Sequence, residues 1–300
     1  MTPFKKIVIC GVGLIGGSLA LALRKSGYKG QILGLERSAD ILERAHALGI
    51  IDEIGLPVED TLKEADLVVL SVPVAQTGNV LKMILPYWHD GLIVSDTGST
   101  KMDVIARARE VLGDKIVRFI PAHPIAGRET NGPEAAIDDL FVGKKTVIAA
   151  LPENSRDDVE KIADLWERCG AIIHHLSPEN HDTVFATVSH MPHLLAYGLV
   201  DYVANHPKSD LFFQYAASGF RDFTRIAGSS PEMWRDITLA NRKQLLVELD
   251  AYLKEIERIR ELVDQADGNG LEAIYSNAQT ARMNWLNAIE NPEKRKSTDG

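Results

Sequence analysis

The sequence has few cysteines, no long apolar run and a deficit of positive charge. Its 300 residues contain two cysteines, Cys10 and Cys169, which lie far apart and form neither a disulfide framework nor a CxxC motif, so a reducing cytoplasm is the expected location. No apolar stretch reaches the roughly 20 residues of a membrane-spanning helix. Lys and Arg number 33 against 42 Asp and Glu, and this net charge of −9 argues against nucleic acid or an anionic membrane as partner. Any anion must be bound by a local site.

The pattern of apolar residues divides the chain into two parts. Up to about residue 175, short apolar segments such as KKIVIC and DLVVL alternate with segments of helical periodicity. Strands that are apolar on both faces and separated by helices are typical of a mainly parallel sheet covered on both sides. We therefore predict an α/β domain over residues 1–175.

The second part, residues 176–300, shows helical periods in long segments. These segments cover residues 182–203, 209–227, 231–263 and 271–288. We predict an all-α domain here. Helices this long and apolar often pack against a second subunit, so we expect a homodimer formed through this domain.

A glycine motif joins the first predicted strand to the first predicted helix. Residues 11–16 read GVGLIG, a GxGxxG pattern in which the glycines permit a tight turn, close approach of a pyrophosphate and close helix packing. Glu36 follows Gly16 by 20 residues, at the end of the second strand, where a carboxylate binds ribose hydroxyls and repels a 2′-phosphate. We predict a Rossmann-type fold that binds NAD. Arg37 could hold a 2′-phosphate, so NADP stays open.

Three further segments follow predicted strands, at residues 71–73 (SVP), 96–99 (DTGS) and 122–127 (AHPIAG). Ligands of parallel sheets lie beyond the carboxyl ends of the strands, so these segments should converge beside the nicotinamide. Ser99 can contact substrate there, and it can also cap the helix that starts near Lys101. The predicted cofactor-binding residues are Gly11, Gly13, Leu14, Ile15, Gly16, Glu36, Arg37, Val72, Pro73 and Thr97.

His123 lies between a predicted strand and a turn that contains Pro124 and Gly127. This position would hold its imidazole rigidly at the top of the sheet. Histidine titrates near neutral pH and can take the proton of a hydroxyl as hydride leaves the same carbon. A structural histidine bonded to a loop carbonyl is the alternative. We favour a catalytic His123.

Five histidines between residues 174 and 193 raise the question of a metal site. His190 and His193 are three residues apart on one predicted helix, but no HxxxH or HExxH motif accompanies them, and we predict no metal. Pro192 removes a helical hydrogen bond and should kink this helix, turning its neighbours toward a cleft. We expect His193 to donate a hydrogen bond to substrate.

Arg221 and Arg225 are flanked by aromatic and apolar residues in GFRDFTRIA, so at least one guanidinium should point inward. A buried arginine must be paired. Its partner is either a nearby carboxylate, from Asp222, Glu232 or Asp236, or an anionic substrate. In a protein of net charge −9, an arginine is a local means of capturing a carboxylate.

A resemblance to a known family rests on five segments of the sequence. In chain order these are GVGLIGGSLA, SDTGSTK, AHPIAGRE, HDTVFATVSHMPH and GFRDFTRIAGSSPEMWRDI. Over about residues 5–285 the chain resembles the prephenate/arogenate (cyclohexadienyl) dehydrogenase family of tyrosine biosynthesis. Many dehydrogenases share GxGxxG, whereas HPIAG combined with SHMPH and DFTRIA is specific. The resemblance implies oxidative decarboxylation of a small cyclohexadienyl acid with hydride transfer to NAD(P)+. Prephenate and arogenate both stay open as substrates.

The resemblance also implies roles for particular residues. His123 is then the catalytic histidine that accepts the proton of the ring hydroxyl, and Ser99 is its polar partner. Arg225 would bind a substrate carboxylate, and its segment can reach the site from the second subunit of a dimer. Glu129 would contribute to an ionic gate. The substrate-binding residues implied in this way are His193, Arg225, Glu129 and Arg221.

Two other functions share some of these features. A β-hydroxyacid dehydrogenase or imine reductase also pairs a Rossmann half with a helical half, but needs a lysine or other proton donor in the helical half. A redox-sensing dimer could bind NAD(H) without catalysis. The presence of Ser99, His123 and Arg225 argues against such a sensor.

Overall fold

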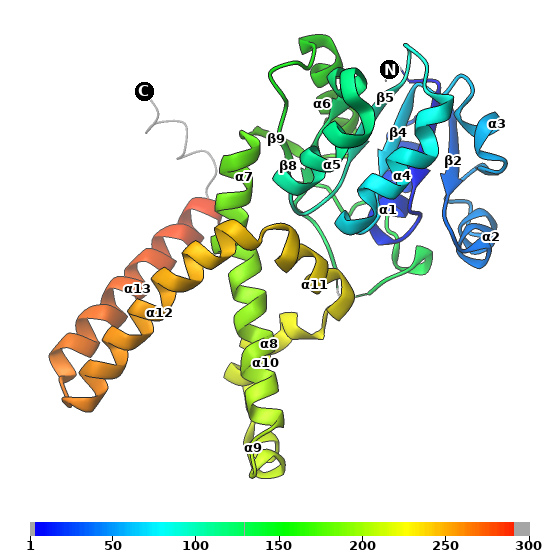
Figure 1. Ribbon diagram of the computed structural model, residues 1–300. Helices are drawn as coiled ribbons and strands as arrows, with labels where there is room; N and C mark the ends of the chain where they lie inside the picture. The colour runs from blue at the N-terminus through cyan, green and yellow to red at the C-terminus, as the bar shows by residue number, and fades with distance from the viewer. Residues whose placement is uncertain (1–3, 129, 291–300) are drawn as a thin grey trace. The chain divides into compact units, whose positions relative to one another are not determined.

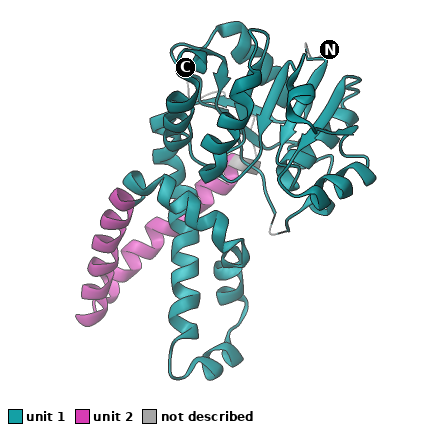
Figure 2. Cartoon of the chain, turned by 45° about the vertical axis from the view of Figure 1, so that its right-hand side comes forward, with its two compact units in different colours: residues 1–245 teal, residues 246–300 magenta. Residues whose placement is uncertain are grey.

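The computed structural model describes residues 4–128 and 130–290 of the chain (Figure 1). The chain forms two compact units, residues 1–245 and residues 246–300 (Figure 2). The first unit contains the whole α/β part and most of the helical part. The boundary that we place at residue 175 marks a change of secondary structure, and it stays a prediction.

Six parallel strands form the main sheet, in the order β3-β2-β1-β4-β5-β6. The strand order reverses between β1 and β4, and the crevice at such a switch point is where doubly wound sheets bind their ligands. This sheet confirms the predicted α/β architecture. The strands are β1 (Lys6–Cys10), β2 (Gln31–Leu35), β3 (Glu53–Ile54), β4 (Leu67–Leu70), β5 (Ile93–Asp96) and β6 (Phe119–Ile120).

Helices cover both faces of this sheet because its central strands are apolar on both faces. Side chains of β1 alternate, so that Ile7 and Ile9 pack in a core with α1 and α6, while Val8 and Cys10 pack in a second core with α4 and α5. The helices of this part are α1 (Leu14–Lys25), α2 (Ala39–Ala47), α3 (Val58–Leu62), α4 (Thr77–Ile84), α5 (Met102–Leu112) and α6 (Arg156–Arg168), with 3-10 turns η1 (Val74–Gln76), η2 (Leu85–Tyr87), η3 (Gly113–Arg118) and η4 (Pro133–Ala135).

A second sheet of three strands follows the first. It consists of β7 (Ala122–Pro124), β8 (Lys145–Ile148) and β9 (Ile172–His175), in the order β7-β8-β9. β7 is antiparallel to β8, and β8 is parallel to β9. Pro121 separates β7 from β6, the last strand of the main sheet. The short edge strand β7 contains His123.

The remaining elements are helical, and three of the predicted long segments are broken. Residues 182–203 are interrupted by a π turn just before Pro192, residues 209–227 by extended backbone at Ala216 and Ala217, and residues 231–263 at Asn241. The elements are α7 (Pro178–Phe185), the π turn η5 (Ala186–His190), α8 (Met191–Ala204), α9 (Ser209–Tyr215), α10 (Ser218–Thr224), η6 (Arg225–Gly228), α11 (Pro231–Ala240), α12 (Arg242–Asp264) and α13 (Gly268–Glu290).

Both cysteines are buried and unpaired. Burial raises the pKa of Cys10 and of Cys169 to about 12, so both remain neutral thiols at physiological pH. In the described part of the chain, no helix combines the length and the apolar character needed to cross a membrane.

Candidate active site

The glycine motif forms the turn between β1 and α1. Gly11 has a φ of +95°, and a Cβ there would lie 2.3 Å from the Ser71 carbonyl oxygen, so no other residue fits. A Cβ on Gly16 would lie 2.1 Å from the Gly11 carbonyl oxygen. A Cβ on Gly13, in contrast, would meet no atom within 4 Å, and Gly13 precedes the first N–H groups of α1. This open space at a helix N-terminus fits a dinucleotide pyrophosphate.

The other predicted cofactor residues lie along the same edge of the sheet. Glu36 directly follows β2, and its carboxylate accepts a hydrogen bond from the N–H of Arg37 at 2.8 Å. Arg37 has an exposed side chain. Leu14 and Ile15 form the first turn of α1, with Leu14 buried and Ile15 half-buried. The carboxylate of Glu36 is therefore placed at a strand end, as the ribose contact requires.

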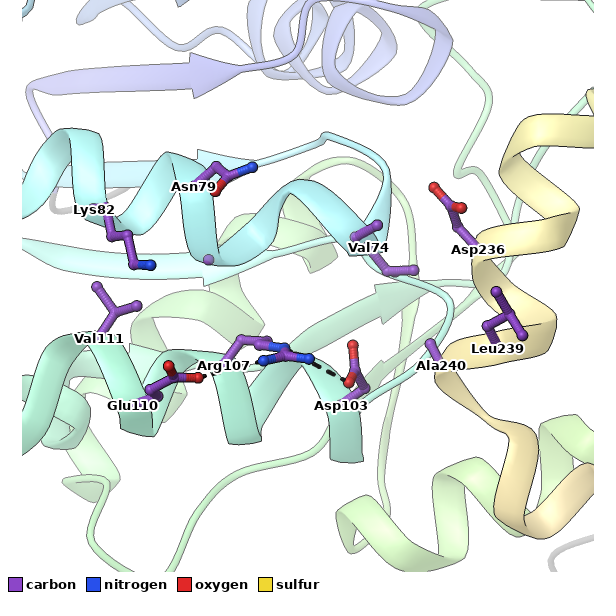
Figure 3. Close-up of a pocket in the computed structure, with 12 residues that line it drawn as sticks. Val74, Asn79, Lys82, Asp103, Arg107, Glu110, Val111, Asp236, Leu239 and Ala240 are labelled. Carbon is purple, nitrogen blue, oxygen red and sulfur yellow. Dashed lines mark hydrogen bonds and ion pairs between the residues drawn. The ribbon is translucent and has the colours of Figure 1, made fainter.

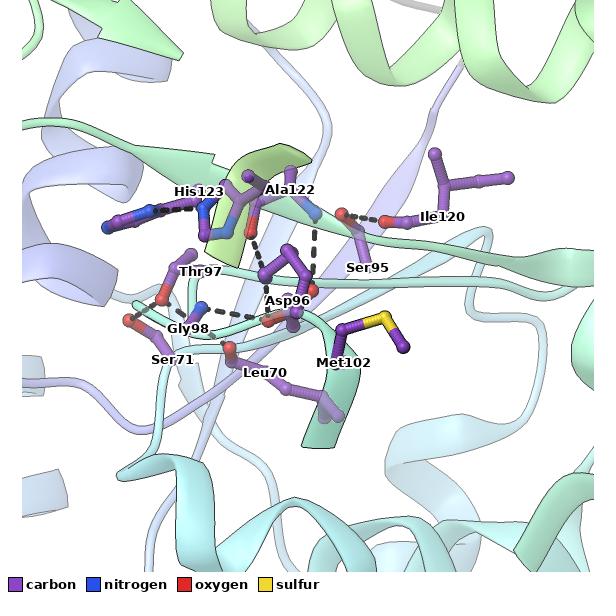
Figure 4. A network of polar contacts seen from close by, with 12 residues as sticks. Leu70, Ser71, Ser95, Asp96, Thr97, Gly98, Met102, Ile120, Ala122 and His123 are labelled. Carbon is purple, nitrogen blue, oxygen red and sulfur yellow. Dashed lines mark hydrogen bonds and ion pairs between the residues drawn. The ribbon is translucent and has the colours of Figure 1, made fainter. Parts of the chain in front are cut away.

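The ends of β4 and β5 meet beside this turn. The Thr97 hydroxyl, after β5, donates to the Ser71 hydroxyl, after β4, at 3.2 Å (Figure 4). Val72 and Pro73 continue from Ser71, and Val72 lies against Gly11. Three of the predicted cofactor residues, Val72, Pro73 and Thr97, thus follow two neighbouring strand ends of the main sheet.

His123 is the middle residue of β7 and is buried. Its Nδ1 lies 2.8 Å from Nε2 of His181, and Nδ1 of His181 lies 2.8 Å from Oδ1 of Asp182. His181 and Asp182 belong to α7, 58 or more residues away in sequence. The three side chains form one hydrogen-bonded series, Asp182–His181–His123.

The carboxylate end of this series decides the tautomer of both rings. A carboxylate can only accept, so Nδ1 of His181 carries a proton. In the neutral ring, Nε2 of His181 then accepts, and Nδ1 of His123 must donate to it. The second nitrogen of His123, Nε2, is left with a lone pair. His123 is therefore held in the form that can take a proton.

Burial and charge keep this series in that state. Burial lowers the pKa of His123 well below 6.5, and the charges of His181, Lys101 and His190 lower it further. Burial also lowers the pKa of His181. Burial alone would raise the pKa of Asp182, but hydrogen bonds from His181 and from two backbone N–H groups bring it below its ordinary value. At neutral pH both rings are neutral and Asp182 is a carboxylate.

Asp182 also caps α5. Its Oδ1 accepts from the N–H of Lys101 at 2.8 Å and its Oδ2 from the N–H of Met102 at 2.9 Å. The prediction that Ser99 could cap this helix is wrong, because α5 starts at Met102 and its cap position, Lys101, makes no side-chain cap bond. Ser99 lies half-buried in the loop between β5 and α5. The capping carboxylate comes from 80 residues further along the chain.

Asn241, between α11 and α12, joins this series to His190. Its Nδ2 donates to the Asp182 carbonyl at 2.7 Å and to Nδ1 of His190 at 3.0 Å. Burial lowers the pKa of His190 to about 4, and the nearby Ser99 backbone acts in the opposite direction. The neutral His190 ring therefore carries its proton on Nε2.

His193 lies in the first turn of α8, where its Nδ1 donates to the Ser189 carbonyl at 2.8 Å. Its ring stacks on Trp234 of α11, with 3.5 Å between centroids. Burial lowers the pKa of His193, and the nearby charge of Arg225 lowers it further. The hydrogen bond to Ser189 acts in the opposite direction and raises this pKa. The neutral ring offers Nε2 as an acceptor. The predicted role of His193 as a donor to substrate would need the protonated ring.

The prediction of an inward-pointing arginine is wrong for the single chain. Arg221 is 78% exposed and pairs with Asp222 at 3.3 Å. Arg225 is also exposed, at the start of η6. The reason is that α10 is only seven residues long and buries none of its side chains. Glu129, the predicted gate residue, lies outside the described residues.

A cavity of about 380 Å³ lies between α4, α5 and α11 (Figure 3). The cavity is lined by side chains of both charges, with Lys82 and Arg107 positive and Asp103, Glu110 and Asp236 negative. Arg107 lies 3.9 Å from Asp103 and 3.4 Å from Glu110. Among the described residues that line it, none belongs to the predicted catalytic or substrate-binding set. We treat this cavity as separate from the candidate active site.

The low histidine pKa values predict that acid destabilises the fold. Below about pH 6.5 the unfolded chain binds protons at His123, His181, His190 and His193 that the folded chain excludes, so stability is complete above this pH and falls below it. For His190, with a pKa of about 4, the loss between 6.5 and 4 is about 3 kcal/mol. Urea unfolding at about pH 7.5 and about pH 4 measures this difference. An equal free energy of unfolding at both values would contradict it.

Comparison with known proteins gives the family. The family model described as "Prephenate dehydrogenase, nucleotide-binding domain" matches residues 19–175, and "Prephenate dehydrogenase, dimerization domain" matches residues 177–277. The chain belongs to the prephenate dehydrogenase family. The predicted family is confirmed, as is the predicted Rossmann-type part followed by helices. This family replaces the alternative prediction of a β-hydroxyacid dehydrogenase or imine reductase.

Members of the prephenate dehydrogenase family are similar over nearly the whole chain. The cyclohexadienyl dehydrogenase of Zymomonas mobilis is 36% identical over 285 residues, which cover 94% of this chain and 97% of that protein. The prephenate dehydrogenase of Bacillus subtilis is 36% identical over 282 residues, 92% of this chain and 75% of that protein. A crystal structure of A. aeolicus prephenate dehydrogenase with hydroxyphenyl propionate and NAD+ has a TM-score of 0.87 and 36% identity, covering 93% of this chain and 98% of that one.

Proposed function

We propose that this protein is an NAD-dependent oxidoreductase of tyrosine biosynthesis that decarboxylates prephenate to 4-hydroxyphenylpyruvate, arogenate to tyrosine, or both. Membership of the prephenate dehydrogenase family supports this function. NAD is the cofactor we propose, because the Glu36 carboxylate would repel the 2′-phosphate of NADP. The two unpaired cysteines support a cytoplasmic enzyme. The residues proposed to hold NAD are Gly11, Gly13, Leu14, Ile15, Gly16, Glu36, Arg37, Val72, Pro73 and Thr97.

In the proposed reaction, Nε2 of His123 takes the proton of the ring hydroxyl, with Ser99 as polar partner at that oxygen. The C–H bond at the same carbon breaks, and bound NAD+ would supply the acceptor for the hydride. The bond to the ring carboxylate then breaks, its electron pair enters the ring and CO₂ leaves. The ring is now aromatic, and its oxygen recovers the proton from His123. Two electrons leave as hydride, so the balance needs no further oxidant.

The observation that carries the proposal is the series Asp182–His181–His123. A protein that only sensed NAD(H) would have no use for a buried, neutral imidazole with a lone pair on its second nitrogen. A dehydrogenase acting on a hydroxyl needs such a base.

Assaying prephenate and arogenate, each with NAD and with NADP, tests the proposed function. We expect reduction of NAD with at least one of the two substrates, and slower reduction of NADP. If neither cofactor is reduced with either substrate, the proposed function is wrong.

We further propose that Arg225 binds a substrate carboxylate near His193, on whose pKa its charge acts. Arg225→Ala should raise the KM for prephenate roughly 10- to 100-fold, because a charge-assisted hydrogen bond contributes about 1.5–3 kcal/mol. The KM for NAD should not change. Arg235→Ala serves as control, because Arg235 is another exposed arginine and pairs with Asp236. A wild-type KM for prephenate in Arg225→Ala would refute carboxylate capture.

We propose that the protein is a homodimer formed through its helical part, in line with the matching dimerization-domain model. Helices α12 and α13 have 23 residues each, and Leu245 is the one buried side chain among those described on them. Helices that leave their apolar side chains in water need a partner surface. The exposed apolar residues on these helices are Leu246, Val247, Leu253, Ile256, Val263, Tyr275, Met283 and Trp285.

Leu253→Glu combined with Ile256→Glu should convert the dimer to monomers, because both exposed side chains lie one turn apart on α12. Light scattering after size-exclusion chromatography gives the mass. We expect two chains per particle for the wild type and for the control Lys254→Ala, and one chain for the double variant. A wild-type protein with the mass of one chain would exclude the proposed dimer.

A further inference from the structure

β7 is the edge strand of the second sheet, and it has a strand partner on one side only in the order β7-β8-β9. The Pro121 carbonyl, just before β7, accepts from the N–H of Ala149, just after β8, at 2.9 Å. Alternate residues of an antiparallel strand bond to the same neighbour, so His123 faces β8 with its backbone and Ala122 faces the other way. The N–H and C=O of Ala122 therefore need partners other than β8, because both are buried.

Asp96, which is labelled beside Ala122 in Figure 4, and Lys101 supply these partners. Oδ1 of Asp96, the last residue of β5, accepts from the N–H of Ala122 at 3.1 Å. Nζ of Lys101 donates to the Ala122 carbonyl at 2.6 Å and to Oδ2 of Asp96 at 2.5 Å. The N–H of Gly98 donates to the same Oδ2 at 2.8 Å and so fixes the carboxylate. An ion pair thus takes the place of a missing strand.

Burying this ion pair costs desolvation free energy, although it provides hydrogen-bond partners for the backbone of only one residue, Ala122. The side chain of Lys101 is 0% exposed and that of Asp96 is 2% exposed. The desolvation of two such charges offsets most of their attraction, and a pair of apolar side chains often gives equal stability. Apolar side chains would leave the Ala122 peptide groups unbonded. What the pair specifically supplies is a fixed position for the residue that precedes His123.

We propose that Asp96 and Lys101 are positioning residues, which hold the backbone of Ala122 and thereby set the position of the His123 imidazole. This inference rests on the proposed role of His123 as the base. Lys101 also donates its backbone N–H to Asp182 at 2.8 Å. One residue therefore links the strand that carries His123 to the carboxylate that orients its ring.

Lys101→Met tests the proposal through kcat. The variant keeps the length of the side chain and removes its charge and its donors. We expect kcat to fall roughly 10- to 100-fold, the cost of a small displacement of a catalytic group, and the Kd for NAD to stay within about twofold of the wild-type value. Wild-type kcat in a folded Lys101→Met protein would overturn the proposal.

The pH profile gives a readout that a merely structural role would not move. The charged and titratable groups around His123 are Lys101 before α5, His181 and Asp182 on α7, His190 on the π turn and Asp96 behind Lys101. Removing the Lys101 charge raises the pKa of His123, so the acid limb of kcat/KM should move to higher pH. An acid limb that stays in place would also count against the proposal.

Arg118→Met is the matched control. Arg118 pairs at 3.1 Å with Asp158, another carboxylate that is 3% exposed, outside the candidate active site. This variant should lose stability with unchanged kcat and acid limb. If Lys101→Met does not fold, the double variant Asp96→Asn, Lys101→Met leaves no unpaired buried charge, and the same fall in kcat is expected for it.

Hydrogen exchange of the Ala122 amide separates this proposal from the proposed function. If the wild-type protein reduces no cofactor, the proposed function is wrong. Hydrogen exchange at the Ala122 amide then still tests whether Asp96 and Lys101 hold the backbone of Ala122. We expect exchange at Ala122 in the double variant to be at least about 10-fold faster than in the wild type, because its carboxylate acceptor, Asp96, is replaced and Lys101 no longer fixes that position. Unchanged exchange would refute the fixing of Ala122.

Discussion

His123→Asn should lower kcat by roughly 10²- to 10⁴-fold, which is the usual contribution of a general base. The asparagine amide can still donate to His181 in place of Nδ1, so the fold and the cofactor turn should persist. It cannot take up a proton. Steady-state kinetics with the better substrate gives kcat, and titration gives the Kd for NAD, which we expect to be unchanged.

His175→Asn is the control for this variant. His175 is exposed at the end of β9 and has no assigned part in the site. It should turn over at the wild-type rate. A kcat close to the wild-type value in His123→Asn would remove His123 from the mechanism.

Asp182→Asn should lower kcat by a similar factor of roughly 10²–10⁴, through the tautomer of His123. Three donors converge on this carboxylate, from the His181 ring and from the N–H groups of Lys101 and Met102. An amide offers one oxygen and turns its NH₂ group toward a donor. If the His181 ring changes tautomer to escape this, Nδ1 of His123 must accept, and its Nε2 then carries a proton and cannot take another.

The stability of Asp182→Asn must be measured alongside its activity, because Asp182 also caps α5. We expect a loss of about 1–3 kcal/mol from the cap and the buried hydrogen bonds. Ser155→Ala provides the comparison, since the Ser155 hydroxyl caps α6 at the Asp158 N–H and lies outside the site. That control should lose about 1 kcal/mol with unchanged kcat. Wild-type turnover in Asp182→Asn would show that the tautomer of His123 does not depend on Asp182.

The main sheet was predictable from sequence because its signals are local. A β-branched strand, three glycines at fixed spacing and an apolar helix lie within residues 6–25, and a Cβ at Gly11 or Gly16 would clash with neighbouring backbone atoms. The helical second half was predictable in kind. Its breaks were not, since the contacts at a break such as Asn241 are distant in sequence: Asn241 bonds to Asp182 and His190, 59 and 51 residues away.

The candidate site was predictable only where one residue carries the chemistry. In the sequence His123 is marked by the apolar run before it and by Pro124 and Gly127 after it, although the structure places it in the middle of the short strand β7 and not between a strand and a turn. Its support was missed, because a helix cap is normally sought within a few residues, and Asp182 caps α5 from 80 residues away. The only signal was the HD pair that opens HDTVFATVSHMPH. No prediction was made for the side chain of Lys101, which is buried and bonds to the backbone of the edge strand β7.

The prediction that Arg221 or Arg225 points inward was wrong for the single chain. Flanking aromatic residues suggested that Arg221 or Arg225 is buried, but Phe223 beside them is itself 54% exposed. Exposed apolar residues on a short surface helix indicate a surface that packs against a partner. In the proposed dimer, that partner is the second subunit.

The most direct test of the proposed mechanism is the protonation state of His123 in the wild-type protein near neutral pH. Nitrogen NMR shifts of the histidine rings report it, and the His123→Asn variant assigns the signal. We expect a proton on Nδ1 and none on Nε2, the state imposed by Asp182 through His181. A His123 ring protonated on both nitrogens, or on Nε2 alone, would contradict its role as the base.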